Sequence, residues 1–170
     1  MTFLSNRINS LSESATLMMT KLGRELTAKG INVISLSIGE PDFNTPDNVK
    51  EAAKKALDEN WTRYSPVAGY PELRQAIVNK LKRENNLDYD ISQIVVSTGA
   101  KQSLSNAILT LVNPGEEVII PTPYWVSYSE MVDLAEGKAV FIDTTIESNF
   151  KITPAQLEAA ITPKTKLFMF

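Results

Sequence analysis

Residues 93–121 read QIVVSTGAKQSLSNAILTLVNPGEEVIIP. The stretch holds a β-branched apolar run, a turn of small residues, a pattern with helical spacing, a second turn and a second β-branched run. The alternation continues downstream, with helices predicted at 124–137 and 154–161 and strands at 138–142 and 166–170. Short apolar strands that alternate with amphipathic helices are typical of an α/β layer. The sequence therefore predicts an α/β fold with a mainly parallel sheet.

The chain upstream of this region predicts helices and one further strand. Residues 31–39, INVISLSIG, alternate and are β-branched, which predicts a strand. The Thr45–Pro46 pair predicts the start of a helix, with the Thr45 hydroxyl as its cap. Pro71 predicts the start of another helix after a loop that contains Tyr64.

The composition excludes several classes of function. The chain has 170 residues, a net charge of −3, and neither cysteine nor histidine. No basic face is available for nucleic acid, and the usual nitrogen and sulfur ligands of a metal are missing. No apolar run is long enough to cross a membrane, and the N-terminus lacks the pattern of a secretory signal. We expect a cytoplasmic protein without a metal, a nucleic-acid partner or a membrane partner.

The chain ends on an apolar run. The last residues, TKLFMF, stop without a turn or a polar tail. Natural termini usually lie in polar segments at the surface. We therefore expect the 170 residues to be the front part of a longer protein.

The turn at Gly99 has the composition of a phosphate site. It lies where a predicted strand passes into a predicted helix, and ligands of parallel α/β sheets collect at such strand ends. Gly99 and Ala100 let a ligand approach the backbone, the helix start offers N–H groups, and Lys101 adds a positive charge. The alternative is that small residues simply make a tight connection between strand and helix.

A second strand end carries aromatic residues. The stretch PTPYWVSY, residues 121–128, includes Trp125 and two tyrosines, which are suited to stacking on a flat ring. The alternative is that Trp125 is a core aromatic at a helix start. A phosphate cradle and an aromatic surface at the same edge of a sheet indicate a site for a phosphorylated aromatic cofactor.

Four stretches together resemble a known family. They are ISLSIGEPDFNTP, YSPVAGYPELR, STGAKQSLSNAILTLVNPGEEVIIPTPYW and TPKTKLFMF. In order and spacing they are similar to the N-terminal part of class I aminotransferases, the pyridoxal-phosphate enzymes of fold type I, and most of all to bacterial aspartate aminotransferases of subgroup Ib. The resemblance implies an N-terminal arm and small-domain segment at 1–45, and the first part of the large, cofactor-binding domain at 46–170.

The resemblance also implies cofactor contacts for particular residues. Gly99, Ala100 and Lys101 match the family's phosphate-binding turn, in which the N–H groups of the last two hold the phosphate of pyridoxal 5'-phosphate. Trp125 matches the aromatic residue that stacks on the pyridine ring. Tyr64 matches the tyrosine that reaches the phosphate of the neighbouring subunit's cofactor, which implies a homodimer. A loop aromatic that packs locally is the alternative for Tyr64.

Substrate contacts follow from the same resemblance. Gly39 matches the glycine whose backbone meets the substrate carboxylate, and Trp125 lines the same site. Lys101, Ser14 and Thr16 match the cation and hydroxyls that contact an acidic side chain, a sensible set for a carboxylate. The alternatives are solvent-exposed cap residues for Ser14 and Thr16, and a simple turn for the segment around Gly39.

The resemblance implies transfer of an amino group from an L-amino acid, in particular aspartate, to a 2-oxo acid, in particular 2-oxoglutarate. No catalytic residue is identified within the chain, because the family's Schiff-base lysine lies beyond Phe170. We therefore expect residues 1–170 alone neither to fold stably nor to catalyse. Open alternatives are an aromatic or alanine aminotransferase, a carbon–sulfur lyase, the effector-binding domain of a transcription regulator, and an unrelated phosphate-binding α/β domain. Activity on prephenate is also open.

Overall fold

The computed structural model describes residues 3–170. The chain divides into two compact units. The sheet unit consists of the described residues up to Ile38 together with Ser103–Phe170, and the helical unit is Gly39–Gln102. Each unit is described by itself below. The predicted division at residues 45 and 46 stays a prediction.

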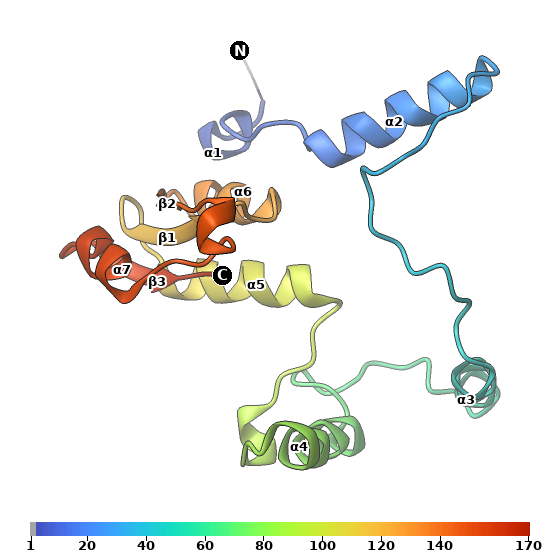
Figure 1. Cartoon of the computed structure of the whole chain (residues 1–170). Coiled ribbons are helices and arrows are strands. Elements are labelled where there is room, and N and C mark those ends of the chain that lie inside the picture. The colour runs from blue at the N-terminus through green and yellow to red at the C-terminus, as the bar shows by residue number, and fades with distance from the viewer. Residues whose placement is uncertain (1–2) are drawn as a thin grey trace. The chain divides into compact units, whose positions relative to one another are not determined.

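A three-stranded parallel sheet forms the centre of the sheet unit. Its strands are β1 (Glu117–Thr122), β2 (Lys138–Asp143) and β3 (Thr165–Phe168), in the order β2-β1-β3 (Figure 1). Ile119 of β1 is paired with Val140 on one side and with Phe168 on the other. The predicted α/β class and parallel sheet are confirmed, because all three strands form where the apolar runs predict them.

The core of the sheet unit surrounds β1. Val118, Ile119 and Ile120 have no exposed surface, as expected for the central strand of a parallel sheet. Ile108 of α5 (Ala100–Leu111) and Val132 of α6 (Ser127–Leu134) belong to the same buried cluster as Val118 and Ile120. The short helix α7 (Pro154–Ala160) contacts β2 and is capped by the Thr153 side chain. A short 3₁₀ turn, η2 (Ile146–Ser148), precedes α7.

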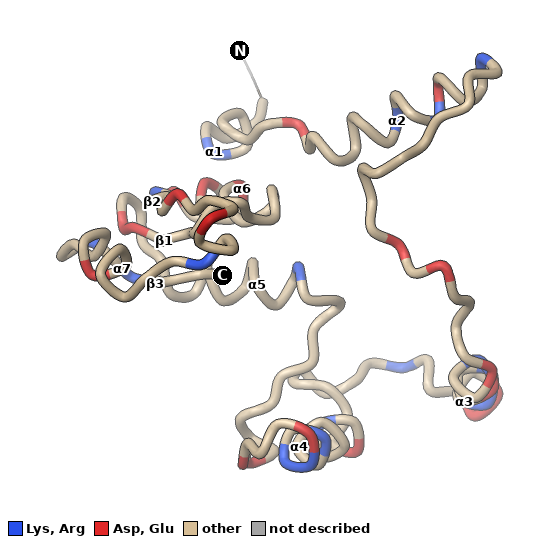
Figure 2. Tube along the Cα trace, in the orientation of Figure 1, with Lys and Arg blue, Asp and Glu red and all other residues tan. Residues whose placement is uncertain are grey.

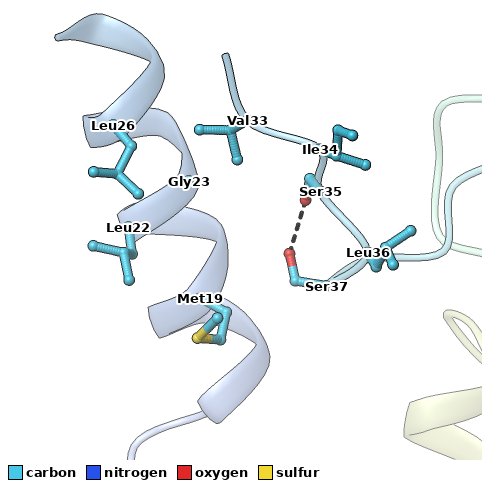
Figure 3. A pocket seen from close by; sticks show the side chains of 9 residues that line it. All are labelled: Met19, Leu22, Gly23, Leu26, Val33, Ile34, Ser35, Leu36 and Ser37. Atoms are coloured by element: carbon cyan, nitrogen blue, oxygen red, sulfur yellow. Dashed lines mark hydrogen bonds between the residues drawn. The ribbon is translucent and has the colours of Figure 1, made fainter. Parts of the chain in front are cut away.

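The N-terminal part of the sheet unit holds two helices, α1 (Asn6–Asn9) and α2 (Ala15–Ala28). The predicted strand at 31–39 is wrong for this structure. Residues 31–38 run extended but pair with no other strand among residues 3–170. Extended apolar residues form a strand only when a neighbouring backbone accepts and donates their hydrogen bonds. An apolar groove lies between α2 and this segment, and the Ser35 and Ser37 hydroxyls hydrogen bond beside it at 3.0 Å (Figure 3).

The helical unit contains α3 (Asp47–Asp58), α4 (Pro71–Asn85) and the 3₁₀ turn η1 (Ile91–Gln93). Pro71 opens α4 as predicted. The predicted Thr45 cap is wrong, because Pro46 is the N-cap of α3 and no side chain caps that helix. The apolar run at 93–97 predicts a strand, but these residues join no strand among the described residues.

Charge is distributed unevenly over the helices. Lys, Arg, Asp and Glu are interspersed along α3 and α4, whereas Lys101 is the one charged residue of α5 (Figure 2). On α3, Lys50 pairs with Asp47, which is typical of a solvated helix face. Within residues 3–170, no helix combines the length and the apolar character that a membrane span requires.

Candidate functional site

The turn at Gly99 joins an extended segment to the first residue of α5. Gly99 has φ +87°, a conformation that glycine adopts without steric cost. Its N–H donates to the Ser97 carbonyl at 2.8 Å, and the Thr98 N–H donates to Oε1 of Gln102. A Cβ built on Gly99 would meet no heavy atom within 4 Å. The backbone of this turn is therefore open to an approaching ligand.

Ala100 and Lys101 are the first two helical residues after Gly99, and both are exposed. The first turn of an α-helix directs its backbone N–H groups out of the positive end of the helix dipole. A phosphate is the ligand that such a helix start prefers. The structure thus brings three predicted residues together in a geometry that fits a phosphate.

Two other predicted residues lie in loops of the helical unit. Gly39 is exposed, and a Cβ built there would meet nothing within 4 Å. Tyr64 lies in the loop between α3 and α4, and its exposed fraction of 105% shows that it packs against none of the described residues. The structure therefore excludes the alternative in which Tyr64 is held by local packing. Gly39 lies in an irregular segment, and its role stays a prediction.

In the sheet unit, Trp125 follows the carboxyl end of β1 and precedes α6. The predicted helix start at 124 is too early, because α6 begins at Ser127 and Trp125 lies in the connecting loop. Trp125 is 44% exposed as a residue, and its ring meets that of Tyr128 edge to face, with the centroids 5.6 Å apart. A half-exposed ring is not the core aromatic of the alternative, and its open surface can stack on a ligand.

Tyr124 is the neighbouring aromatic residue, and it has a packing role. Its ring is stacked on Phe141 of β2 at 5.1 Å, and its hydroxyl lies 3.3 Å from the Ser129 Oγ. These contacts fix the loop between β1 and α6 on both sides of Trp125. The two adjacent aromatic residues therefore differ: Tyr124 packs against the protein, and Trp125 is partly exposed to solvent.

Ser14 and Thr16 lie at the start of α2. The Ser14 Oγ accepts a hydrogen bond from the Leu17 N–H at 3.4 Å, so the cap role considered for Ser14 is present, with the residue half-buried rather than exposed. Capping uses the oxygen as an acceptor and leaves the hydroxyl proton able to bind a carboxylate. Thr16 is half-buried in the first turn of the helix. Both hydroxyls lie at the positive end of the helix dipole, which favours an anion.

One contact that sequence reasoning missed ties this segment to α6. The Ser12 N–H donates to Oε2 of Glu130 at 3.2 Å, and α1 contacts α6 (Figure 1). Glu130 also raises the pKa of Asp133, although burial of that carboxyl is the larger cause. An acidic residue in an amphipathic helix gives no sequence signal for such a contact, since its partner is a backbone group far along the chain.

The aminotransferase class I and II family model matches residues 31–170. The chain therefore belongs to the class I and II aminotransferases. It is 54% identical over its whole length to the aspartate/prephenate aminotransferase of Cereibacter sphaeroides, of which it spans 42%.

Solved structures of this family are also similar. The aspartate aminotransferase from Rhizobium meliloti aligns with 99% of the chain at 45% identity and a TM-score of 0.93, over 42% of its own length. The aspartate aminotransferase from Thermus thermophilus with maleate aligns with 99% of the chain at 43% identity and a TM-score of 0.94, over 44% of its own length. The chain thus spans less than half the length of these relatives.

Aminotransferases of this family depend on pyridoxal 5'-phosphate. The residues of the chain fit this cofactor in two respects. The open turn at Gly99, followed at once by a helix start, suits the phosphate. The half-exposed ring of Trp125 suits the pyridine ring.

Proposed function

We propose that the full-length protein is an aspartate aminotransferase that moves the amino group of L-aspartate to 2-oxoglutarate with pyridoxal phosphate. The observation that carries the proposal is the Gly99 turn, with its positive φ, its open backbone and the immediate start of α5. The family membership and the names of the relatives support the same assignment.

In this proposal, four groups of residues make the contacts with the cofactor. The backbone N–H groups of Ala100 and Lys101 bind the phosphate, and Gly99 allows its close approach. Trp125 holds the pyridine ring flat, so that the bond to be broken at the substrate α-carbon is correctly aimed. When bound, the cofactor withdraws electrons from that α-carbon. Tyr64, whose ring is fully exposed, reaches the cofactor phosphate of a second subunit, so the protein acts as a homodimer.

Recognition of the substrate uses one backbone group and three side chains. The backbone at Gly39 meets the α-carboxylate of the amino acid. Lys101 supplies a cation for the side-chain carboxylate of aspartate, and the hydroxyls of Ser14 and Thr16 donate hydrogen bonds to it. Charge-assisted hydrogen bonds of this kind are about twice as strong as neutral ones. The reaction takes place in the cytoplasm on small, soluble acids.

Prephenate is a second candidate for the amino acceptor. The observation that favours it is the name of the relative from Cereibacter sphaeroides, which covers both aspartate and prephenate. Prephenate carries a ring and two carboxylates. Its recognition therefore requires both the cation of Lys101 and an aromatic surface such as Trp125.

The test uses the two tryptophans of the chain in the full-length protein. Trp61, like Trp125, is about half exposed and meets a tyrosine edge to face, so it is a matched control. Pyridoxal phosphate should quench tryptophan fluorescence in wild type and W61F, and the quench should be much smaller in W125F. Assays with aspartate and 2-oxoglutarate, and then with aspartate and prephenate, should yield glutamate or the aminated acid.

Other outcomes would point to the alternatives. Cofactor binding with release of a thiol, when a sulfur-containing amino acid is supplied, indicates a carbon–sulfur lyase. Ligand binding without turnover indicates an effector-binding domain. A quench that persists in W125F and disappears in W61F would contradict the place of Trp125 in the site.

A further inference from the structure

The segment that leads into the Gly99 turn is held by a side chain of α4. Nε of Arg74 donates to the Ile94 carbonyl at 2.9 Å, and Nη2 donates to the Ile91 carbonyl. Arg74 is half-buried, and its guanidinium presents a planar fork of donors that can hold two carbonyls at once. Residues 94–97 belong to no strand in the described chain, and the bond from Arg74 to Ile94 holds the first residue of this segment.

The 3₁₀ turn η1 is fixed at its other end by Asp90. The Asp90 carboxylate accepts from the Ser92 N–H at 2.8 Å, and the Asp90 N–H donates to Oε1 of Gln93 at 2.8 Å. Hydrogen bonds from Ser92 lower the pKa of Asp90, and the Arg74 charge lowers it further. Asp90 and Arg74 therefore hold both ends of the same short turn.

A second attachment joins the segment to the loop that carries Tyr64. The Val96 N–H donates to the Ala68 carbonyl at 3.0 Å. A Cβ built on Gly69 would lie 2.7 Å from Cγ2 of Val96, and Gly69 has φ +96°. Only glycine allows the loop to lie this close to Val96.

The two attachments lie close in sequence to groups proposed to bind phosphate. Three residues separate Val96 from Ala100, where α5 begins, so the path of residues 94–96 fixes where the Gly99 turn lies. Tyr64 lies five residues before Gly69, in the loop that Val96 fastens. The contacts of residues 94–96 thus hold both the Gly99 turn and the Tyr64 loop, the two elements that contact phosphate groups in the proposed function.

We infer that Arg74 and Gly69 are positioning residues for phosphate binding: Arg74 holds the approach to the Gly99 turn, and Gly69 fastens the Tyr64 loop to it. The inference rests on the proposed function and extends it to two residues that touch neither cofactor nor substrate. Loss of either attachment weakens binding of the cofactor phosphate and leaves binding of the pyridine ring unchanged.

The experiment compares pyridoxal phosphate with pyridoxal, which differ only in the phosphate. Affinities of both for the full-length protein are measured for wild type, R74M, R74K and G69A. R83M is the matched control, since Arg83 lies on the same helix but is exposed and pairs with Glu84. We expect R74M to lower the ratio of the affinity for pyridoxal phosphate to that for pyridoxal about tenfold or more. The ratio should fall less in R74K, which keeps one donor group, and should not change in R83M. G69A should also lower the ratio.

Thermal stability is measured alongside, because a merely structural role would lower the melting temperature without changing this ratio. Wild-type ratios in both R74M and G69A would overturn the inference, whatever their stability. If R74M is not recovered folded, R74K and G69A decide in the same way. Failure of the proposed function is distinct, because wild type itself would then bind pyridoxal phosphate no more tightly than pyridoxal.

Discussion

The Ser12 backbone N–H and the Glu130 carboxylate are joined by a hydrogen bond of 3.2 Å across 118 residues of sequence. The bond links the segment ahead of α2 to helix α6. Ser14 lies two residues after Ser12, and Trp125 lies two residues before α6 begins. A single contact therefore ties the hydroxyls proposed to bind the substrate to the element that follows the proposed ring contact.

Substitution E130A should raise KM for aspartate about fivefold, which corresponds to about 1 kcal/mol, a typical value for one hydrogen bond. The value of kcat should change little, because Glu130 contacts the N-terminal segment and no group that we place at the cofactor. E130Q retains an acceptor oxygen and should lie between E130A and wild type. Steady-state kinetics of the full-length protein measure this, with E158A as the control, since Glu158 is exposed on α7. An unchanged KM in E130A would contradict the prediction.

Substitution K101A should reduce kcat/KM for aspartate about 100-fold, as expected when a charged partner of a carboxylate is removed. The effect on alanine, which has no side-chain carboxylate, should be much smaller. Comparing the two substrates in one variant separates recognition of the substrate side chain from cofactor binding, because loss of cofactor would lower both rates equally. Equal losses would show that Lys101 does not select the acidic substrate and would favour an enzyme for uncharged amino acids.

The strands of the sheet could be predicted because each contains an apolar run, and the run of the central strand β1 is fully buried. Val118, Ile119 and Ile120 follow one another without a polar residue, a pattern that is typical of a central parallel strand. Residues 31–39 alternate between apolar and polar residues and residues 94–96 are an apolar run, yet neither segment is a strand in the structure. The local sequence indicates that a segment prefers an extended conformation, but pairing with another strand depends on a backbone elsewhere in the chain.

The candidate site was predictable to a similar degree. Gly99 could be singled out because glycine between an apolar run and a helix indicates a turn with positive φ. Its φ of +87° confirms this conformation. Arg74 and Glu130 could not be found, because both bind backbone groups of segments that are remote in sequence. Any carbonyl or N–H can serve as such a partner, so the sequence carries no pattern for the contact.

Substitution G99A separates conformation from space at the phosphate turn. A Cβ at this position meets nothing within 4 Å, so the only cost is a left-handed backbone for alanine, about 1–2 kcal/mol. We expect a loss of about five- to thirtyfold in affinity for pyridoxal phosphate, because the turn leaves its binding conformation. G23A is the control: Gly23 lies inside α2 with equally open surroundings and no positive φ. It should be neutral or slightly stabilising, since alanine favours helix. Retention of wild-type affinity in G99A would contradict the need for positive φ.

The last prediction concerns a buried carboxylate at the start of β1. Glu117 is only 7% exposed, and its Oε2 accepts from the Thr162 hydroxyl at 2.6 Å. That bond is the main reason why the pKa of Glu117 is lowered, and the Lys138 charge, with Nζ 3.6 Å away, lowers it further. A carboxyl with a lowered pKa in the folded state stabilises the fold above its unfolded pKa, and this contribution is lost as the pH falls through the folded pKa.

Substitution T162V should therefore lower the melting temperature of the full-length protein at pH 7, and the difference from wild type should shrink on acidification to about pH 3.5, below the ordinary glutamate pKa of about 4.3. The control is T110V, because the Thr110 hydroxyl donates to the backbone carbonyl of Asn106, a group that does not titrate. Its effect should be the same at both pH values. Melting curves of the three proteins across this range test the assignment. If the T162V difference stays constant with pH, the bond from Thr162 is not what holds the Glu117 carboxylate in its charged form.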